Sequence, residues 1–290
     1  MSSPLRALLS SRRGALVMGV CNRTPDSFSD GGRFLDDAAA VAHVRGLVIE
    51  GAHILDIGAE STRPGSSPID AAEQIRRIGG LIRASVELGV VVSIDTTLPD
   101  VAAWALGEGA RIVNTVSLEP AAELGALCAR AGASLVLMHC RGSMTDMRGF
   151  SMYDDAAYGD VVADVAREWT EAAERALAEG LPRDDLVLDP GLGFAKNARH
   201  SIELCARLDE LAALGFPVLV GPSRKSFVAR AANPDASALA PPDERLGGTI
   251  AAVLACVSGG AAIVRVHDVK AVVQALAVAA AIDARRGGDA

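Results

Sequence analysis

Polar side chains that could bind or react recur at the ends of short apolar runs. Each run is rich in Val, Ile and Leu, and a carboxylate, an amide, an imidazole or a cation stands at or just after its end. The residues in these positions are Asn22, Asp56, Asp95, Asn114, His139, Asp189, Lys225, Arg265 and His267. Such groups accept or donate hydrogen bonds and carry charge, whereas no Ser or Cys nucleophile comes with an evident base. The pattern therefore favours binding and charge stabilisation over covalent catalysis.

Two kinds of ligand fit these side chains. A flat polar heterocycle suits the acceptors and donors among them, because ring N–H and amino groups need acceptors while ring oxygen and nitrogen need donors. This group consists of Asp95, Asn114, Asp189 and Lys225. An anion suits the others, because the planar guanidinium group of Arg matches phosphate. This second group consists of Asn22, Arg63, Arg265 and His267.

The elements that must position these side chains are the apolar runs themselves. They predict buried strands at 15–20, 53–58, 90–95, 111–116, 134–139, 185–190, 217–221 and 261–267. Helical patterns lie between and after them at 36–50, 68–88, 99–108, 119–131, 154–180, 198–213, 244–258 and 268–285, with a short helix after 226. Eight alternating units of this kind predict an α/β protein with one (β/α)8 TIM barrel domain. The alternative is a doubly wound open sheet, but no GxGxxG motif follows the first strand.

In a barrel, the carboxyl ends of all the strands lie on one face, which is where active sites form. Each polar residue alone has a structural interpretation. Asp56 could accept hydrogen bonds from backbone amides, and Asp95 could cap a helix. Because all of these residues would share one rim, a functional site is the better interpretation. The polar loop from Asn22 to Gly32 is long for a strand-to-helix connection, and we expect it to be a mobile cover for that site rather than an ordinary surface loop.

Composition limits the remaining possibilities. The chain has 290 residues, a net charge of −8 and only 3% aromatic residues, which argues against a nucleic-acid or membrane-surface partner. The five cysteines are dispersed and odd in number, a pattern typical of a reducing compartment, so we expect a cytoplasmic protein. We expect a flexible N-terminal extension at 1–14, the barrel at 15–285 and a C-terminal tail at 286–290.

Six motifs identify a resemblance that covers about residues 15–282. They are Asn22–Gly32, Glu60–Gly65, Ser93–Thr96, Asp189–Lys196, Ser223–Phe227 and Arg265–Val269. In this order and at these strand ends, the chain resembles the dihydropteroate synthase family of pterin-binding barrels. The resemblance implies a transferase of folate biosynthesis. Such an enzyme condenses 6-hydroxymethyl-7,8-dihydropterin diphosphate with 4-aminobenzoate and releases 7,8-dihydropteroate and diphosphate.

The resemblance also implies roles for individual residues. The pterin would be held by Asp95, Asn114, Asp189 and Lys225, with Met138 against its ring. The 4-aminobenzoate site would be shaped by Phe28, Pro64, Phe194, Lys225 and Ser226. Thr62 would belong to the substrate site, and Asn22 would bind a Mg²⁺ cofactor. Arg63, Arg265 and His267 would line the anion pocket, and the catalytic residues would be Asp95, Asp189, Lys225 and Arg63.

Two other functions stay open at this point. Thr115–Leu118 follows Asn114 where the family usually has Asp and a Gly-containing turn, so a non-catalytic pterin-binding paralogue is one alternative. A methyltetrahydrofolate-dependent methyltransferase on the same barrel is the other, although such an enzyme does not need the Thr24–Phe28 loop or Ser223–Lys225. The resemblance further implies that the protein is a sulfonamide target, that its partners are small molecules and that a homodimer is possible.

Overall fold

The computed structural model describes residues 3–12, 14–23, 32–59, 69–142 and 153–286; for 32–36 it describes the backbone alone. Within these ranges, short apolar segments form the strands of one parallel sheet. The strands are β1 (Leu16–Asn22), β2 (Ile54–Gly58), β3 (Val91–Asp95), β4 (Ile112–Thr115), β5 (Ser134–Met138), β6 (Leu186–Asp189), β7 (Val218–Val220) and β8 (Ala261–Val266). Most of their residues are buried whichever face they point to. Burial on both faces explains why the strands are continuous apolar runs rather than alternating ones.

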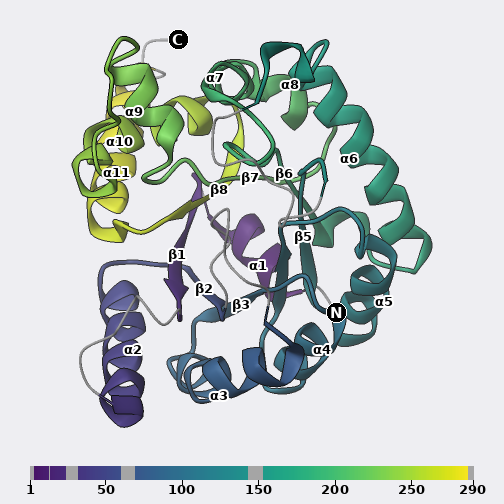
Figure 1. Ribbon diagram of the computed structural model, residues 1–290. Coiled ribbons are helices and arrows are strands. Elements are labelled where there is room, and N and C mark those ends of the chain that lie inside the picture. The colour runs from purple at the N-terminus through teal and green to yellow at the C-terminus, as the bar shows by residue number, and fades with distance from the viewer. Residues whose placement is uncertain (1–2, 13, 24–31, 60–68, 143–152, 287–290) are drawn as a thin grey trace.

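The sheet closes on itself. Its strand order is β1 to β8 in sequence, and β1 pairs with both β2 and β8 in parallel register. Helices surround the strands as an outer ring (Figure 1). The prediction of a single (β/α)8 barrel is thus confirmed, and the alternative of an open doubly wound sheet is wrong.

The outer ring and the connections contain the helical segments. The α-helices are α1 (Pro4–Ser11), α2 (Gly32–Ile49), α3 (Ala71–Glu87), α4 (Pro99–Gly107), α5 (Ala121–Ala131), α6 (Val161–Ala178), α7 (Ala198–Ala206), α8 (Leu208–Ala212), α9 (Ser226–Ala232), α10 (Leu246–Ser258) and α11 (Val269–Arg286). Short 3-10 helices are η3 (Asp155–Ala157), η4 (Arg183–Asp185) and η5 (Pro242–Arg245).

Two of the expected helices differ from the sequence-based expectation, one through a capping residue and the other through a local change in the backbone. The helix expected at 154–180 begins only at Val161, as α6. Just before it, the Asp160 carboxylate accepts hydrogen bonds from the amides of Val162 (2.9 Å) and Ala163 (3.1 Å). Such a cap satisfies amides that have no partner within the helix and so fixes where the helix starts. The expected helix 198–213 is divided into α7 and α8 at Arg207, whose backbone leaves the helical region (φ −115°, ψ 32°).

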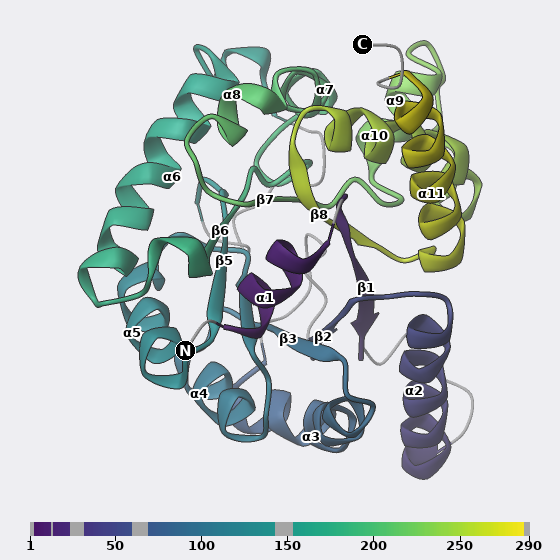
Figure 2. The ribbon, with the colours of Figure 1, turned by 180° about the vertical axis from the view of Figure 1, so that it is seen from behind.

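The N-terminal segment also differs from expectation. In place of a flexible extension, residues 4–11 form helix α1, which begins with Pro4 after a Ser3 cap. Leu5 of this helix is completely buried, in a cluster with inward-facing strand residues such as Leu16, Met18 and Ile54. In Figure 2, α1 lies in front of the strands at the centre of the ring of helices. Helix α1 therefore covers the amino-terminal opening of the barrel.

Polar contacts fix α1 at this end. The Ser3 hydroxyl contacts the Asp185 carboxylate at 2.5 Å and the Ser134 hydroxyl at 3.0 Å, and Arg6 donates to Asp185 at 2.8 Å.

Most of the remaining core lies between the strands and the outer helices. No described helix is long and apolar enough to cross a membrane, and all five cysteines are free thiols.

Candidate active site

The predicted site residues that the structure describes stand at one end of the barrel. Asn22 ends β1 and is level with Gly58, which is level with Asp95 at the end of β3; Asp95 is in turn level with Asn114 on β4. Met138 and Asp189 end β5 and β6 and pair with each other. Parallel strands with this register bring their terminal side chains to one rim, as the sequence predicts.

Arg265 on β8 is the ionic centre of this rim. Its Nε donates to Asp56 Oδ2 at 2.7 Å, and its Nη2 donates to Asp95 Oδ2 at 2.8 Å. Asn114 Nδ2 donates to the same Asp56 oxygen at 3.1 Å. Burial alone would lower the pKa of Arg265, but the nearby carboxylates outweigh it and raise the pKa, so the guanidinium stays charged. One cation thus ties together three strands.

Asp189, which is buried, and Lys225, which is partly buried, form a second group. Asp189 Oδ1 accepts from the Gly191 amide at 2.7 Å, and Lys225 Nζ donates to the Leu192 carbonyl at 2.5 Å. Burial raises the pKa of Asp189, against the opposing charge of Lys225. Burial likewise lowers the pKa of Lys225 to about 8, with Asp189 acting in the opposite direction. A titratable acid and a titratable base therefore stand together at the rim, as is common in functional sites.

An apolar wall stands beside these charges. Val116, Met138 and Phe194 form a separate small cluster with exposed fractions of 7%, 3% and 6%, and Cys140 and Tyr153 pack against it. The Lys225 ammonium lies 4.5 Å from the centre of the Phe194 ring. A flat aromatic or conjugated ligand could stack on such a wall while its edge meets the polar groups.

His267 and Ser226 lie on the side of β7 and β8. The Ser223 hydroxyl lies 3.0 Å from His267 Nδ1 and accepts from the His267 amide at 3.2 Å. Burial first, and then Arg265 and Arg224, lower the pKa of His267 to about 4, so its ring is neutral near pH 7. If Ser223 donates to Nδ1, the proton of the neutral ring is on Nε2. Ser226 begins α9, directly after Lys225.

Asn22 offers an oxygen without a partner among the described residues. Its Oδ1 is buried, and a Cβ added to Gly58 would lie only 2.7 Å from it. An unsatisfied buried carbonyl oxygen is costly unless a donor or a cation occupies it. The described residues contain no cluster of three or more His, Cys, Asp or Glu side chains that could hold a metal ion. Asn22 would therefore suit a cation that keeps most of its waters.

Four predicted site residues lie outside the described residues. They are Phe28, Thr62, Arg63 and Pro64. The covering loop expected from Asn22 to Gly32 falls largely there as well, so its predicted role stays a prediction.

Sequence reasoning missed two parts of the site. The sequence suggests no ligand role for Asp56, and its contact with Arg265, 209 positions away, has no local signal. Lys196 ends the Asp189–Lys196 motif, whose pattern predicts no role for it, although its side chain is completely buried beside His139. A lysine in an otherwise apolar and Gly-rich segment was the signal that could have found it, because Lys is rarely buried without partners.

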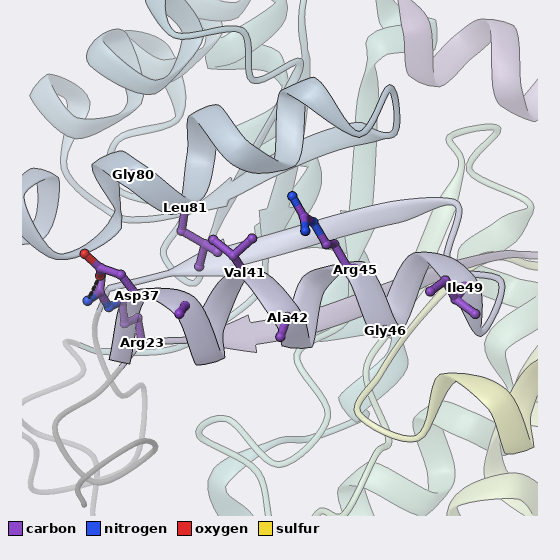
Figure 3. Close-up of a pocket in the computed structure, with 10 residues that line it drawn as sticks. Arg23, Asp37, Val41, Ala42, Arg45, Gly46, Ile49, Gly80 and Leu81 are labelled. Carbon is purple, nitrogen blue, oxygen red and sulfur yellow. Dashed lines mark ion pairs between the residues drawn. The ribbon is translucent and has the colours of Figure 1, made fainter. Parts of the chain in front are cut away.

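A separate pocket of about 720 Å³ lies outside the barrel between α2 and α3 (Figure 3). Its lining is mostly apolar, with Val41, Ile49 and Leu81 among the residues. Arg23 at one end is ion-paired with Asp37. No predicted site residue that the structure describes lines this pocket. The rim of the barrel, where opposite charges meet the apolar wall, is therefore the better candidate for the active site.

Comparisons with known proteins agree with this assignment. Residues 18–267 match the family of pterin binding enzymes. The dihydropteroate synthase of Mycobacterium leprae is 45% identical over 268 residues, which are 91% of this chain and 92% of that protein. A structure of Xanthomonas albilineans dihydropteroate synthase with 4-aminobenzoic acid is 38% identical, with a TM-score of 0.83 over 93% of this chain and 94% of that one. The complex of the same enzyme with 7,8-dihydropteroate has a TM-score of 0.80 at 36% identity and the same coverage.

Proposed function

Because the chain belongs to the pterin binding enzyme family, we propose that it catalyses the dihydropteroate synthase reaction. In this reaction 6-hydroxymethyl-7,8-dihydropterin diphosphate and 4-aminobenzoate give 7,8-dihydropteroate and diphosphate. The observation that carries the proposal is the rim itself, where Asp189 and Lys225 stand beside the Phe194 wall and Arg265 binds two buried carboxylates. These groups match a flat pterin, its diphosphate and an aromatic amine.

The pterin would lie edge-on to the polar groups and flat against the apolar wall. The side-chain oxygens of Asp95, Asn114 and Asp189 would accept hydrogen bonds from the N–H and amino groups of the pterin. Lys225 would donate a hydrogen bond to a ring oxygen or nitrogen. Met138 would pack against the ring, since it is 3% exposed in the same cluster as Phe194. A buried acceptor rejects a ligand that cannot donate to it, so this arrangement would select the pterin.

The diphosphate would lie toward β1 and β8. Arg265 and His267 would meet it there together with Arg63, and Thr62 would belong to the same region. Asn22 fits a Mg²⁺ ligand because its buried Oδ1 has no described partner. When bound, Mg²⁺ would neutralise the negative charge that grows on the departing diphosphate.

The amine would attack from the side of α9. Phe194, Lys225 and Ser226 would shape the 4-aminobenzoate site, with Phe28 and Pro64 from the loops. Departure of diphosphate leaves positive charge on the pterin methylene carbon. The carboxylates Asp95 and Asp189 would stabilise this charge, while the cations at the rim stabilise the leaving group. Holding the amine nitrogen near the methylene carbon supplies the remaining acceleration.

The decisive experiment measures diphosphate release by the purified protein with the pterin diphosphate, Mg²⁺ and 4-aminobenzoate. We expect release that depends on the amine and is inhibited competitively by a sulfonamide. Lys225→Ala should weaken both pterin binding and turnover, whereas the matched change Lys270→Ala, at an exposed position, should not. Pterin binding without amine-dependent release would instead identify a binding paralogue, and transfer of a methyl group from methyltetrahydrofolate would identify a methyltransferase.

Location and assembly are part of the same proposal. A cytoplasmic enzyme would agree with its free cysteines, and a homodimer is the assembly that we expect in solution. Light scattering of the purified protein tests the dimer directly.

A further inference from the structure

The coil between β6 and α7 is wound tightly against the end of β5. Gly191 (φ 69°), Gly193 (φ 78°) and Ala195 (φ 48°) all adopt the left-handed conformation. A side chain at Gly191 would place its Cβ 2.0 Å from the His139 carbonyl oxygen, which shows how closely the two segments approach. Ala195 lacks the freedom of glycine, so its conformation persists only if surrounding contacts hold it.

Lys196 supplies such contacts from beneath the coil. Its side chain is completely buried, and Nζ lies 2.9 Å from His139 Nδ1, 3.3 Å from the His139 carbonyl and 3.1 Å from the Phe194 carbonyl. Burial lowers the pKa of Lys196 to about 7, and in its charged form the ammonium group has three protons to donate to these three acceptors. The two contacts with His139 join the coil to the residue that follows β5, and the contact with Phe194 fixes the coil itself.

His139 is itself oriented by a residue of α6. Its Nε2 lies 3.0 Å from Glu168, which also accepts from Arg141 at 3.0 Å. Burial, reinforced by Lys196, lowers the pKa of His139 to about 4, so the ring is neutral near pH 7. Nδ1 then accepts from Lys196 while Nε2–H donates to Glu168. The tautomer is thus set by its two neighbours.

The opposite side of the coil faces the proposed substrate site. The Leu192 carbonyl accepts from Lys225, and the Phe194 ring lies under the Lys225 ammonium. The Gly191 amide donates to Asp189. The places of Asp189, Phe194 and Lys225 therefore all depend on the conformation of the same coil.

We propose that Lys196 is a positioning residue for the condensation, which holds the 190–195 coil against His139 so that Phe194 and Lys225 meet the substrates at fixed places. The inference rests on the proposed function, although its structural part can be tested without turnover. Lys196 acts through the coil and contacts neither substrate.

The first test is Lys196→Met, which keeps a similar length and removes all three donors. We expect kcat/KM to fall by about 10- to 100-fold, because small displacements of positioning groups have effects of this size. KM should rise for both substrates, since Phe194 and Lys225 move together. Amide hydrogen exchange should accelerate in peptides covering 188–197, with little change in the strands far from the coil.

A matched pair at His139 separates positioning from general packing. In His139→Asn, the amide oxygen replaces Nδ1 as an acceptor for Lys196, and the contact with Glu168 is lost. In His139→Gln, the amide nitrogen replaces Nε2 as the donor to Glu168, and the acceptor for Lys196 is lost. We expect the Asn variant to stay within about 3-fold of the unmodified protein in kcat/KM and the Gln variant to fall by about 10-fold.

Three results would overturn the inference. They are unchanged exchange at 188–197 in Lys196→Met, faster exchange spread evenly over the whole barrel, and a greater loss in His139→Asn than in His139→Gln. If the unmodified protein shows no amine-dependent turnover, the proposed function fails. Calorimetric binding of the pterin diphosphate to the same variants, together with the exchange data, would still decide whether Lys196 positions the coil.

Discussion

Replacing Arg265 by Met removes the cation that, among the described residues, contacts both Asp56 and Asp95 at the rim. Both carboxylates are buried, with exposed fractions of 0% and 8%, and both contact the guanidinium within 2.8 Å. Methionine fills much of the same space but donates no hydrogen bond. The change therefore tests how far this ion triad stabilises the folded barrel.

The expected size follows from the burial of the partners. Breaking a buried ion pair from one side costs about 3–5 kcal/mol, because the remaining charge is buried without compensation. The Arg265 side chain is 20% exposed, so water can partly replace it. We therefore expect a loss of about 2–3 kcal/mol in the free energy of unfolding, which is a shift of about 3–5 °C in Tm for a chain of this length.

Urea denaturation followed by circular dichroism at pH 7.5 measures this loss. The matched control is Arg286→Met, because Arg286 is 78% exposed and its pair with Asp283 should contribute less than about 0.5 kcal/mol. Adding Asp56→Asn to Arg265→Met should recover part of the stability, since one uncompensated charge is removed. If Arg265→Met were as stable as Arg286→Met, the idea of a stabilising triad would be wrong.

Three further predictions concern other parts of the barrel. Gly191→Ala should lower the free energy of unfolding by more than about 2 kcal/mol, because the new Cβ would clash with the His139 carbonyl oxygen. The control Gly132→Ala has a similar φ of 61° but no atom within 4 Å of its Cβ, so it should cost only about 1 kcal/mol. Equal midpoints of the two variants in urea denaturation would contradict this prediction. Pterin affinity, measured by calorimetry, should fall by about 10-fold between pH 7 and pH 9, because Lys225 loses its proton near pH 8, and a flat profile would argue against its role as a charged donor. Leu5→Ala should destabilise the barrel by about 2–4 kcal/mol in thermal unfolding. A loss below about 1 kcal/mol would mean that the packing of α1 over the amino-terminal opening does not stabilise the barrel.

The fold could be predicted from the sequence because its signals are local. Strands buried on both faces read as continuous apolar runs, and the carboxyl end of each run carries a polar residue such as Asp95 or Asp189. The closed topology places those ends on one rim without further information. The rim was therefore predictable, whereas the roles of its residues stay predictions.

The remaining features depend on contacts between distant segments. Arg265 contacts Asp56 and Asp95 across 209 and 170 positions, and no periodicity or spacing signals these pairs. Helix α1 was unexpected for the same reason, since Leu5 is buried only after the strands have formed a closed ring. The division at Arg207 depends on backbone angles that no single residue type there requires.

The closure of β1 onto β8 has a consequence for synthesis of the chain. The edge of β1 that pairs with β8 in the finished barrel stays unpaired until Ala261–Val266 has left the ribosome. At about 5–20 residues per second, the roughly 240 residues between these strands take about 12–50 s to translate. During that interval an apolar strand edge can pair with other chains. Production of this protein should therefore depend on chaperones that shield nascent chains, more than its folded surface would suggest.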